Sequence, residues 1–63
     1  MGHQQTLYAT LNLAAQVMTL ARAAGETALL NTAEFVFRKC SCGVLPTAAE
    51  CRGVLAAHNA LRN

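Results

Sequence analysis

The chain has 63 residues, of which 54% are hydrophobic and 13% are charged, and its formal net charge is +2. A chain of this length forms at most one domain, and it buries only about 60% of the surface that its unfolded form exposes. Its five basic residues are dispersed along the sequence, which argues against the clustered positive charge of a nucleic-acid-binding surface. Polar residues interrupt each long apolar run, which argues against a membrane span.

The N-terminus has no positively charged segment followed by a continuous apolar run and a small-residue cleavage site. We therefore expect no secretory signal and a cytoplasmic location. In that compartment the three cysteines are expected to be reduced thiols.

The first predicted helix covers about residues 5–24. Apolar residues recur along it with alternating spacings of four and three, the pattern of packed helices, and a second apolar line runs beside the first. Together the two lines cover slightly more than half of the circumference, whereas a helix that packs against one neighbour needs a stripe of only about 100°. We therefore predict more than one neighbour and assign this helix to a homodimer interface. The residues of the predicted interface are Leu7, Leu11, Leu13, Ala14, Val17, Met18, Leu20 and Ala21.

The second predicted helix covers about residues 27–40 and follows a break at Gly25. Glycine readily takes the left-handed conformation that ends a helix. A later start near Asn31 stays open, because Asn31 and Glu34 have the spacing of an N-terminal capping pair. The apolar line of this helix consists of Leu29, Ala33, Val36 and Cys40.

The third predicted helix covers about residues 47–61 and has the clearest start. Thr47 and Glu50 form a capping-box pattern directly after Pro46. A second face of this helix carries only small residues, which fits either the close approach of another backbone or simple exposure to water. The small residues are Ala49, Gly53, Ala56 and Ala60, and the predicted buried stripe is Cys51, Val54, Leu55, His58 and Leu61.

The three cysteines, with His58 after them, supply the residue types of a zinc site. Cys51 and His58, however, lie seven residues apart, about 10.5 Å along a helix, and zinc ligands lie only about 2.0–2.3 Å from the metal. Cys40, Cys42, Cys51 and His58 are therefore weak metal candidates, and we expect no cofactor. A disulfide from Cys51 to Cys40 or Cys42 is allowed by the turn but disfavoured in a reducing compartment. In an apolar stripe, His58 is expected to be a hydrogen-bonded core or interface histidine.

The sequence contains no arrangement typical of an enzyme. Nucleophilic catalysis needs a thiol or hydroxyl, a base in reach and a third group that orients the base, and no such set is indicated. The carboxylates of Glu26, Glu34 and Glu50 fall on different polar faces. We therefore predict a protein without enzymatic activity.

Together these elements predict an all-α fold, a helical hairpin plus a third helix that self-associates into a homodimeric helical bundle. The predicted function is that of a small regulatory or adaptor protein that binds a larger protein and inhibits or redirects it. Tyr8, Arg22 and Arg38 are the predicted partner-binding residues, because tyrosine and arginine are enriched in binding hot spots. One alternative is a nucleic-acid-binding regulator with a metal at the cysteine turn, and another is a structural subunit of an assembly.

Overall fold

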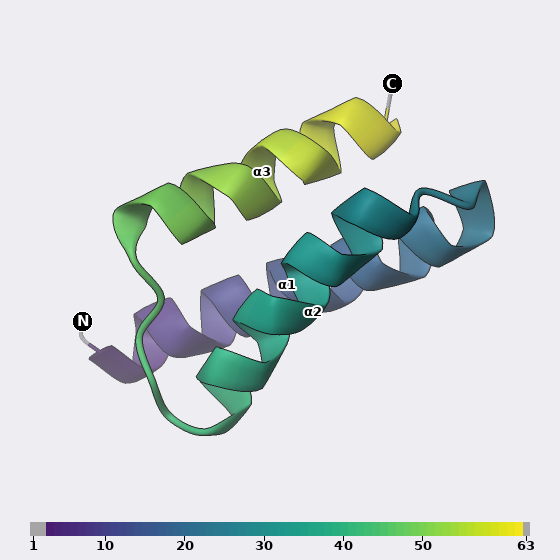
Figure 1. The fold of residues 1–63 in the computed structure, drawn as a ribbon. Coiled ribbons are helices and arrows are strands. Elements are labelled where there is room, and N and C mark those ends of the chain that lie inside the picture. The colour runs from purple at the N-terminus through teal and green to yellow at the C-terminus, as the bar shows by residue number, and fades with distance from the viewer. Residues whose placement is uncertain (1–2, 63) are drawn as a thin grey trace.

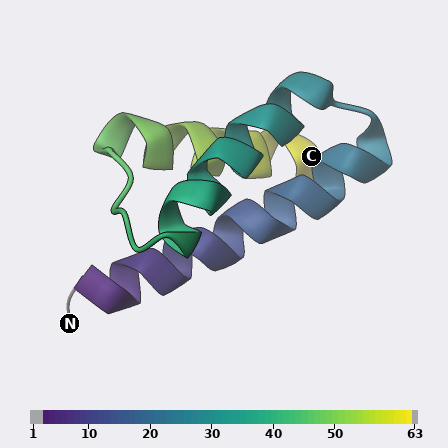
Figure 2. The same cartoon turned by 60° about the horizontal axis from the view of Figure 1, so that its bottom comes forward.

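The computed structural model describes residues 3–62, and the side chains of residues 6–62. It is all-helical, with α1 at His3–Ala24, α2 at Thr27–Ser41 and α3 at Ala48–Arg62, and no strand in this range. α2 runs back along α1, and the connection of residues 42–47 passes the N-terminal part of α1 before α3 begins (Figures 1 and 2). The expected all-α fold of three helices is confirmed. None of these helices has the length and hydropathy needed to cross a membrane.

α1 and α2 end in the same way, each at a glycine in the left-handed region. Gly25 has φ +72° and Gly43 has φ +81°. At the end of α1 the Gly25 amide donates to Arg22 O at 3.3 Å and the next amide donates to Ala21 O at 2.9 Å. The same pair of bonds recurs at the end of α2, where the amides of residues 43 and 44 donate to the carbonyl oxygens of residues 40 and 39. Both ends are thus Schellman motifs, and the predicted helix break at Gly25 is confirmed.

The starts of α2 and α3 differ. α2 begins at Thr27 with Glu26 as its N-cap, which makes no side-chain capping bond, so the alternative start near Asn31 is wrong. α3 begins with the predicted capping box. The Glu50 amide donates to Thr47 Oγ1 at 3.1 Å, and the Thr47 amide donates to Glu50 Oε1 at 2.8 Å.

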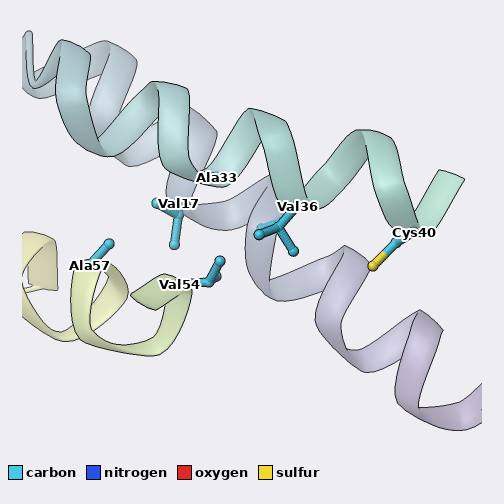
Figure 3. Close-up of a cluster of buried hydrophobic side chains, with 7 residues drawn as sticks. Val17, Ala33, Val36, Cys40, Val54 and Ala57 are labelled. Atoms are coloured by element: carbon cyan, nitrogen blue, oxygen red, sulfur yellow. The ribbon is translucent and has the colours of Figure 1, made fainter. Parts of the chain in front are cut away.

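The core is built from small side chains of all three helices (Figure 3). Among the described side chains, the largest that are fully buried are Val17, Val36 and Val54, one from each helix. The predicted apolar line of α2 is confirmed at Ala33, Val36 and Cys40, which are all buried. The larger apolar side chains lie at the edges of this core of valine and alanine, where they are partly buried.

α1 packs against both α2 and α3, so the prediction of more than one neighbour is confirmed, and both neighbours belong to the same chain. Ala14, Val17 and Ala21, three residues of the predicted dimer interface, are completely buried within the single chain. They therefore offer no surface to a second copy, which corrects their assignment. The broad apolar arc of α1 is accounted for in part by these two intrachain contacts. The remaining five predicted interface residues are half-buried: Leu7, Leu11, Leu13, Met18 and Leu20.

The buried face of α3 also differs from the predicted stripe. Leu55 is 50% exposed, whereas Ala57, which the prediction left out, is buried. The inner face passes through Val54 and Ala57 to Leu61, which packs against the core. The prediction was wrong at Leu55 because residues 54–57 are all apolar, so periodicity alone does not fix which of them faces the core.

Candidate functional site

The three cysteines differ in burial, and all are free thiols. Cys40 is buried at the edge of the core, Cys51 is half-buried on α3, and Cys42 is exposed in the connection. Figure 3 shows the Cys40 sulfur directed into the interior. Burial, followed by the neighbouring Cys51 and Glu50, raises the pKa of the Cys40 thiol above its ordinary value. Cys40 is therefore protonated near neutral pH and is a poor nucleophile in this environment.

An ion pair ties the end of α2 to the start of α3. Lys39 Nζ lies 2.9 Å from Glu50 Oε1 and 3.0 Å from Glu50 Oε2, and the ammonium group also lies 5.3 Å from the centre of the Phe35 ring. The hydrogen bond from Lys39, followed by that from the Thr47 amide, lowers the pKa of Glu50. One carboxylate thus caps α3 and links it to α2. Sequence reasoning found the cap but missed Lys39, because no local spacing rule connects residues 39 and 50.

His58 lies away from the cysteine turn. Its Nε2 is 3.1 Å from Gln16 Oε1, so it joins α3 to α1 as a hydrogen-bonded interhelical residue. Across the side chains that the structure describes, no three His, Cys, Asp or Glu residues are grouped so as to hold a metal ion. The structure therefore does not bring Cys40, Cys42, Cys51 and His58 together as a ligand set.

An open groove of about 490 Å³ runs between α2 and α3, and we call it the α2–α3 groove. Phe35 stands at this groove with 57% of its surface exposed. The charged group in the groove, Glu50, is neutralised by Lys39. The groove is otherwise lined by apolar, small or uncharged polar residues; its full lining is Asn31, Thr32, Phe35, Val36, Ala49, Glu50 and Gly53.

Gly53 forms part of this groove without being required by its packing. A Cβ atom at this position would lie 3.9 Å from Thr32 Cγ2, which is ordinary van der Waals contact. Of the two explanations for the small-residue face of α3, close backbone approach is therefore not needed at Gly53. Ala49, whose side chain is a single methyl group, and Gly53, which has no side chain, instead leave the groove open.

A second cleft, of about 270 Å³, lies where the N-terminal half of α1 meets the end of α2. Tyr8 lines it and is 63% exposed. The other predicted partner-binding residues, Arg22 and Arg38, are exposed but line neither cleft. Arg22 lies fourteen residues along α1 from Tyr8, about 21 Å away, and Arg38 pairs with Glu34 at 3.6 Å. The structure therefore does not join these three residues into one surface. The lining of the second cleft is Leu7, Tyr8, Leu11, Cys40, Ser41 and Gly43.

Several large apolar side chains remain on the surface of the folded chain. Of these, sequence reasoning selected only Tyr8 as a contact residue, because Phe35 and Leu55 fall in apolar stretches of predicted helices and Val44 and Leu45 fall in the break before the third helix. The set is Tyr8, Phe35, Val44, Leu45 and Leu55, each at least 43% exposed.

Comparison with known proteins gives no family model that matches the chain, and no significant match to a curated protein or to a solved structure.

Proposed function

We propose that the chain is a small regulatory or adaptor protein without enzymatic activity, which acts as a helical homodimer and binds a larger protein that it inhibits or redirects. The observation that carries this proposal is the exposed Phe35 ring beside the open α2–α3 groove. A large aromatic side chain next to an unfilled apolar surface is typical of a protein contact, since aromatic residues dominate the energetics of interfaces.

The α2–α3 groove suits an apolar helix or segment of the larger partner. Two helices form its walls, and Ala49 and Gly53 leave room between them. The pairing of Glu50 with Lys39 means that the groove presents no uncompensated charge, so its occupation by an apolar surface leaves no buried charge without a partner. An amphipathic helix laid into a groove is a recurrent mode of such recognition.

The proposed contact with a second copy uses a different surface. It lies on α1, at the predicted interface residues that the fold leaves half-buried. Burial of these side chains against a second α1 would add to a core that contains only short side chains, and short chains commonly gain stability by association. The residues are Leu7, Leu11, Leu13, Met18 and Leu20.

Affinity capture with matched baits tests partner binding. The unaltered chain, Phe35→Ala and Leu55→Ala are each used to capture proteins from a lysate of the source cells, followed by quantitative mass spectrometry. Both variants remove a large exposed apolar side chain, but only Phe35 lines the groove. We expect one protein to be retained by the unaltered chain and by Leu55→Ala and lost with Phe35→Ala. Identical captures with all three baits would contradict the groove as the binding surface.

A further inference from the structure

We propose that Cys40 and Cys51 are a redox-sensitive pair that closes into a disulfide between α2 and α3 when the chain meets a low-molecular-weight disulfide such as oxidised glutathione. The proposal is independent of the proposed function.

The ion pair between α2 and α3 sets the register of the two cysteines. Lys39 Nζ and Glu50 Oε1 are 2.9 Å apart, and Cys40 and Cys51 are the residues that follow these two in the sequence. The side chains of Lys39 and Glu50 bridge α2 and α3 and are partly exposed. The following residue on each helix is turned by about 100°, so both cysteines are carried away from the ion pair.

Cys40 belongs to the buried core, and Cys51 is half-buried, one helical turn from a residue of that core. Cys40 is one turn after Val36 on α2, Cys51 is one turn before Val54 on α3, and residues three or four apart share a helix face. Val36, Cys40 and Val54 belong to one buried cluster. The influence of Cys51 on the pKa of Cys40 agrees with this placement, since it needs the two thiols to be near one another.

The two thiols are accessible to different degrees, which gives the reaction an order. Cys51 is half-buried and partly accessible to a reagent, whereas Cys40 is buried and lines the cleft beside Tyr8. The Cys51 thiolate attacks one sulfur of oxidised glutathione, which forms a mixed disulfide and releases one glutathione thiolate. Cys40 then loses its proton to solvent, and its thiolate attacks the Cys51 sulfur and releases the second glutathione thiolate. The two protein thiols are oxidised, and one glutathione disulfide is reduced to two thiols.

Cys42 competes with Cys40 for the disulfide to Cys51 and therefore serves as an internal control. It is exposed, and it lies closer to Cys51 in the sequence than Cys40 does. In an unfolded chain, therefore, the link from Cys42 to Cys51 forms at least as readily as the link from Cys40, because the cost of closing a loop changes slowly with its length. A preference for Cys40 can come only from the fold.

The test uses two variants, each with two remaining cysteines. Cys42→Ser keeps Cys40 with Cys51, and Cys40→Ala keeps Cys42 with Cys51. Each folded variant is treated with oxidised glutathione, quenched, and cleaved after glutamate, which separates residues 35–50 from residues 51–63. We expect Cys42→Ser to give the two fragments joined, with the loss of two hydrogen atoms, at least about tenfold faster than Cys40→Ala. Glutathione left on Cys51 of Cys42→Ser without a joined product, or equal rates for the two variants, would overturn the proposal.

The unaltered chain covers the case in which Cys40→Ala does not fold. It is oxidised once in native buffer and once in guanidinium chloride, and the fragments that contain Cys40 and Cys42 are sequenced by tandem mass spectrometry. We expect the Cys40–Cys51 link to predominate in native buffer and to lose that preference in denaturant. The same ratio of the two links under both conditions would overturn the proposal.

Discussion

Glu50 receives a hydrogen bond from Lys39 at 2.9 Å and, through the same oxygen, one from the Thr47 amide at 2.8 Å. A single carboxylate therefore holds the start of α3 and fastens it to the end of α2. These bonds favour the ionised form and lower the pKa of Glu50. Because the pKa is lower in the folded chain than in the unfolded chain, folding is stabilised wherever the carboxylate is ionised.

This lowered pKa predicts how stability depends on pH. The contribution of Glu50 is fully present above the ordinary glutamate pKa of about 4.3, and it is lost as the pH falls through the lower pKa of the folded chain. The melting temperature of the unaltered chain should fall as the pH falls through this acidic range. The melting temperature of Glu50→Gln should depend less on pH, and at neutral pH it should be lower than that of the unaltered chain. Glu26→Gln is the control, since the Glu26 side chain makes no capping bond. Equal pH profiles for Glu50→Gln and the unaltered chain would show that these bonds contribute nothing.

The left-handed conformation of Gly43 at the end of α2 predicts that a substitution by alanine lowers the stability of the fold. Gly43 has φ +81°, and a Cβ atom there would meet nothing within 4 Å. The cost of Gly43→Ala is therefore conformational alone, about 1–2 kcal/mol of unfolding free energy. Urea denaturation monitored by circular dichroism measures it. A variant as stable as the unaltered chain would contradict the left-handed conformation at this position.

At Gly53, in contrast to Gly43, a substitution by alanine should stabilise the fold. It lies within α3, and an added Cβ would make only ordinary contact with Thr32. Gly53→Ala should therefore raise the unfolding free energy by about 0.5–1 kcal/mol, because alanine loses less backbone entropy in a helix. The same denaturation experiment compares it directly with Gly43→Ala. A destabilised Gly53→Ala would mean that α2 and α3 approach more closely than the structure shows.

The buried valine core predicts that a substitution of valine by alanine lowers the unfolding free energy more at a buried position than at an exposed one. Val17 is fully buried between all three helices, whereas Val44 is about half exposed in the connection. Val17→Ala should lower the unfolding free energy by about 2 kcal/mol, and Val44→Ala should change it by less than about 0.5 kcal/mol. A loss of 2 kcal/mol is large for a chain of this size, whose total stability is roughly 3–9 kcal/mol. Similar losses in the two variants would contradict the assignment of the core.

Local sequence signals predicted most of the secondary structure, and they failed where long-range geometry decides. The break at Gly25 and the capping box of Thr47 and Glu50 depend only on neighbouring residues, so their positions could be read directly. The rotation of α3 could not be read, because an alanine and a leucine are both apolar and the choice of Ala57 over Leu55 depends on how closely the helices approach.

The candidate site was less predictable than the fold. Sequence reasoning selected Tyr8 as an exposed contact residue, but it did not select Phe35 and did not foresee the α2–α3 groove. A groove exists only once two helices are placed side by side, so no feature of one helix reveals it. The Lys39–Glu50 pair was missed for the same reason.

We propose that another chain covers the apolar surface that this fold leaves exposed. The most direct test is the mass in solution by sedimentation equilibrium at roughly 10 µM, since association depends on protomer concentration. We predict twice the monomer mass of 6.7 kDa for the unaltered chain and for Leu55→Lys, and a shift toward monomer for Leu20→Lys, whose change lies on the half-buried face of α1. A single 6.7 kDa species that binds no hydrophobic dye would show that the folded chain leaves no apolar surface for another chain to cover.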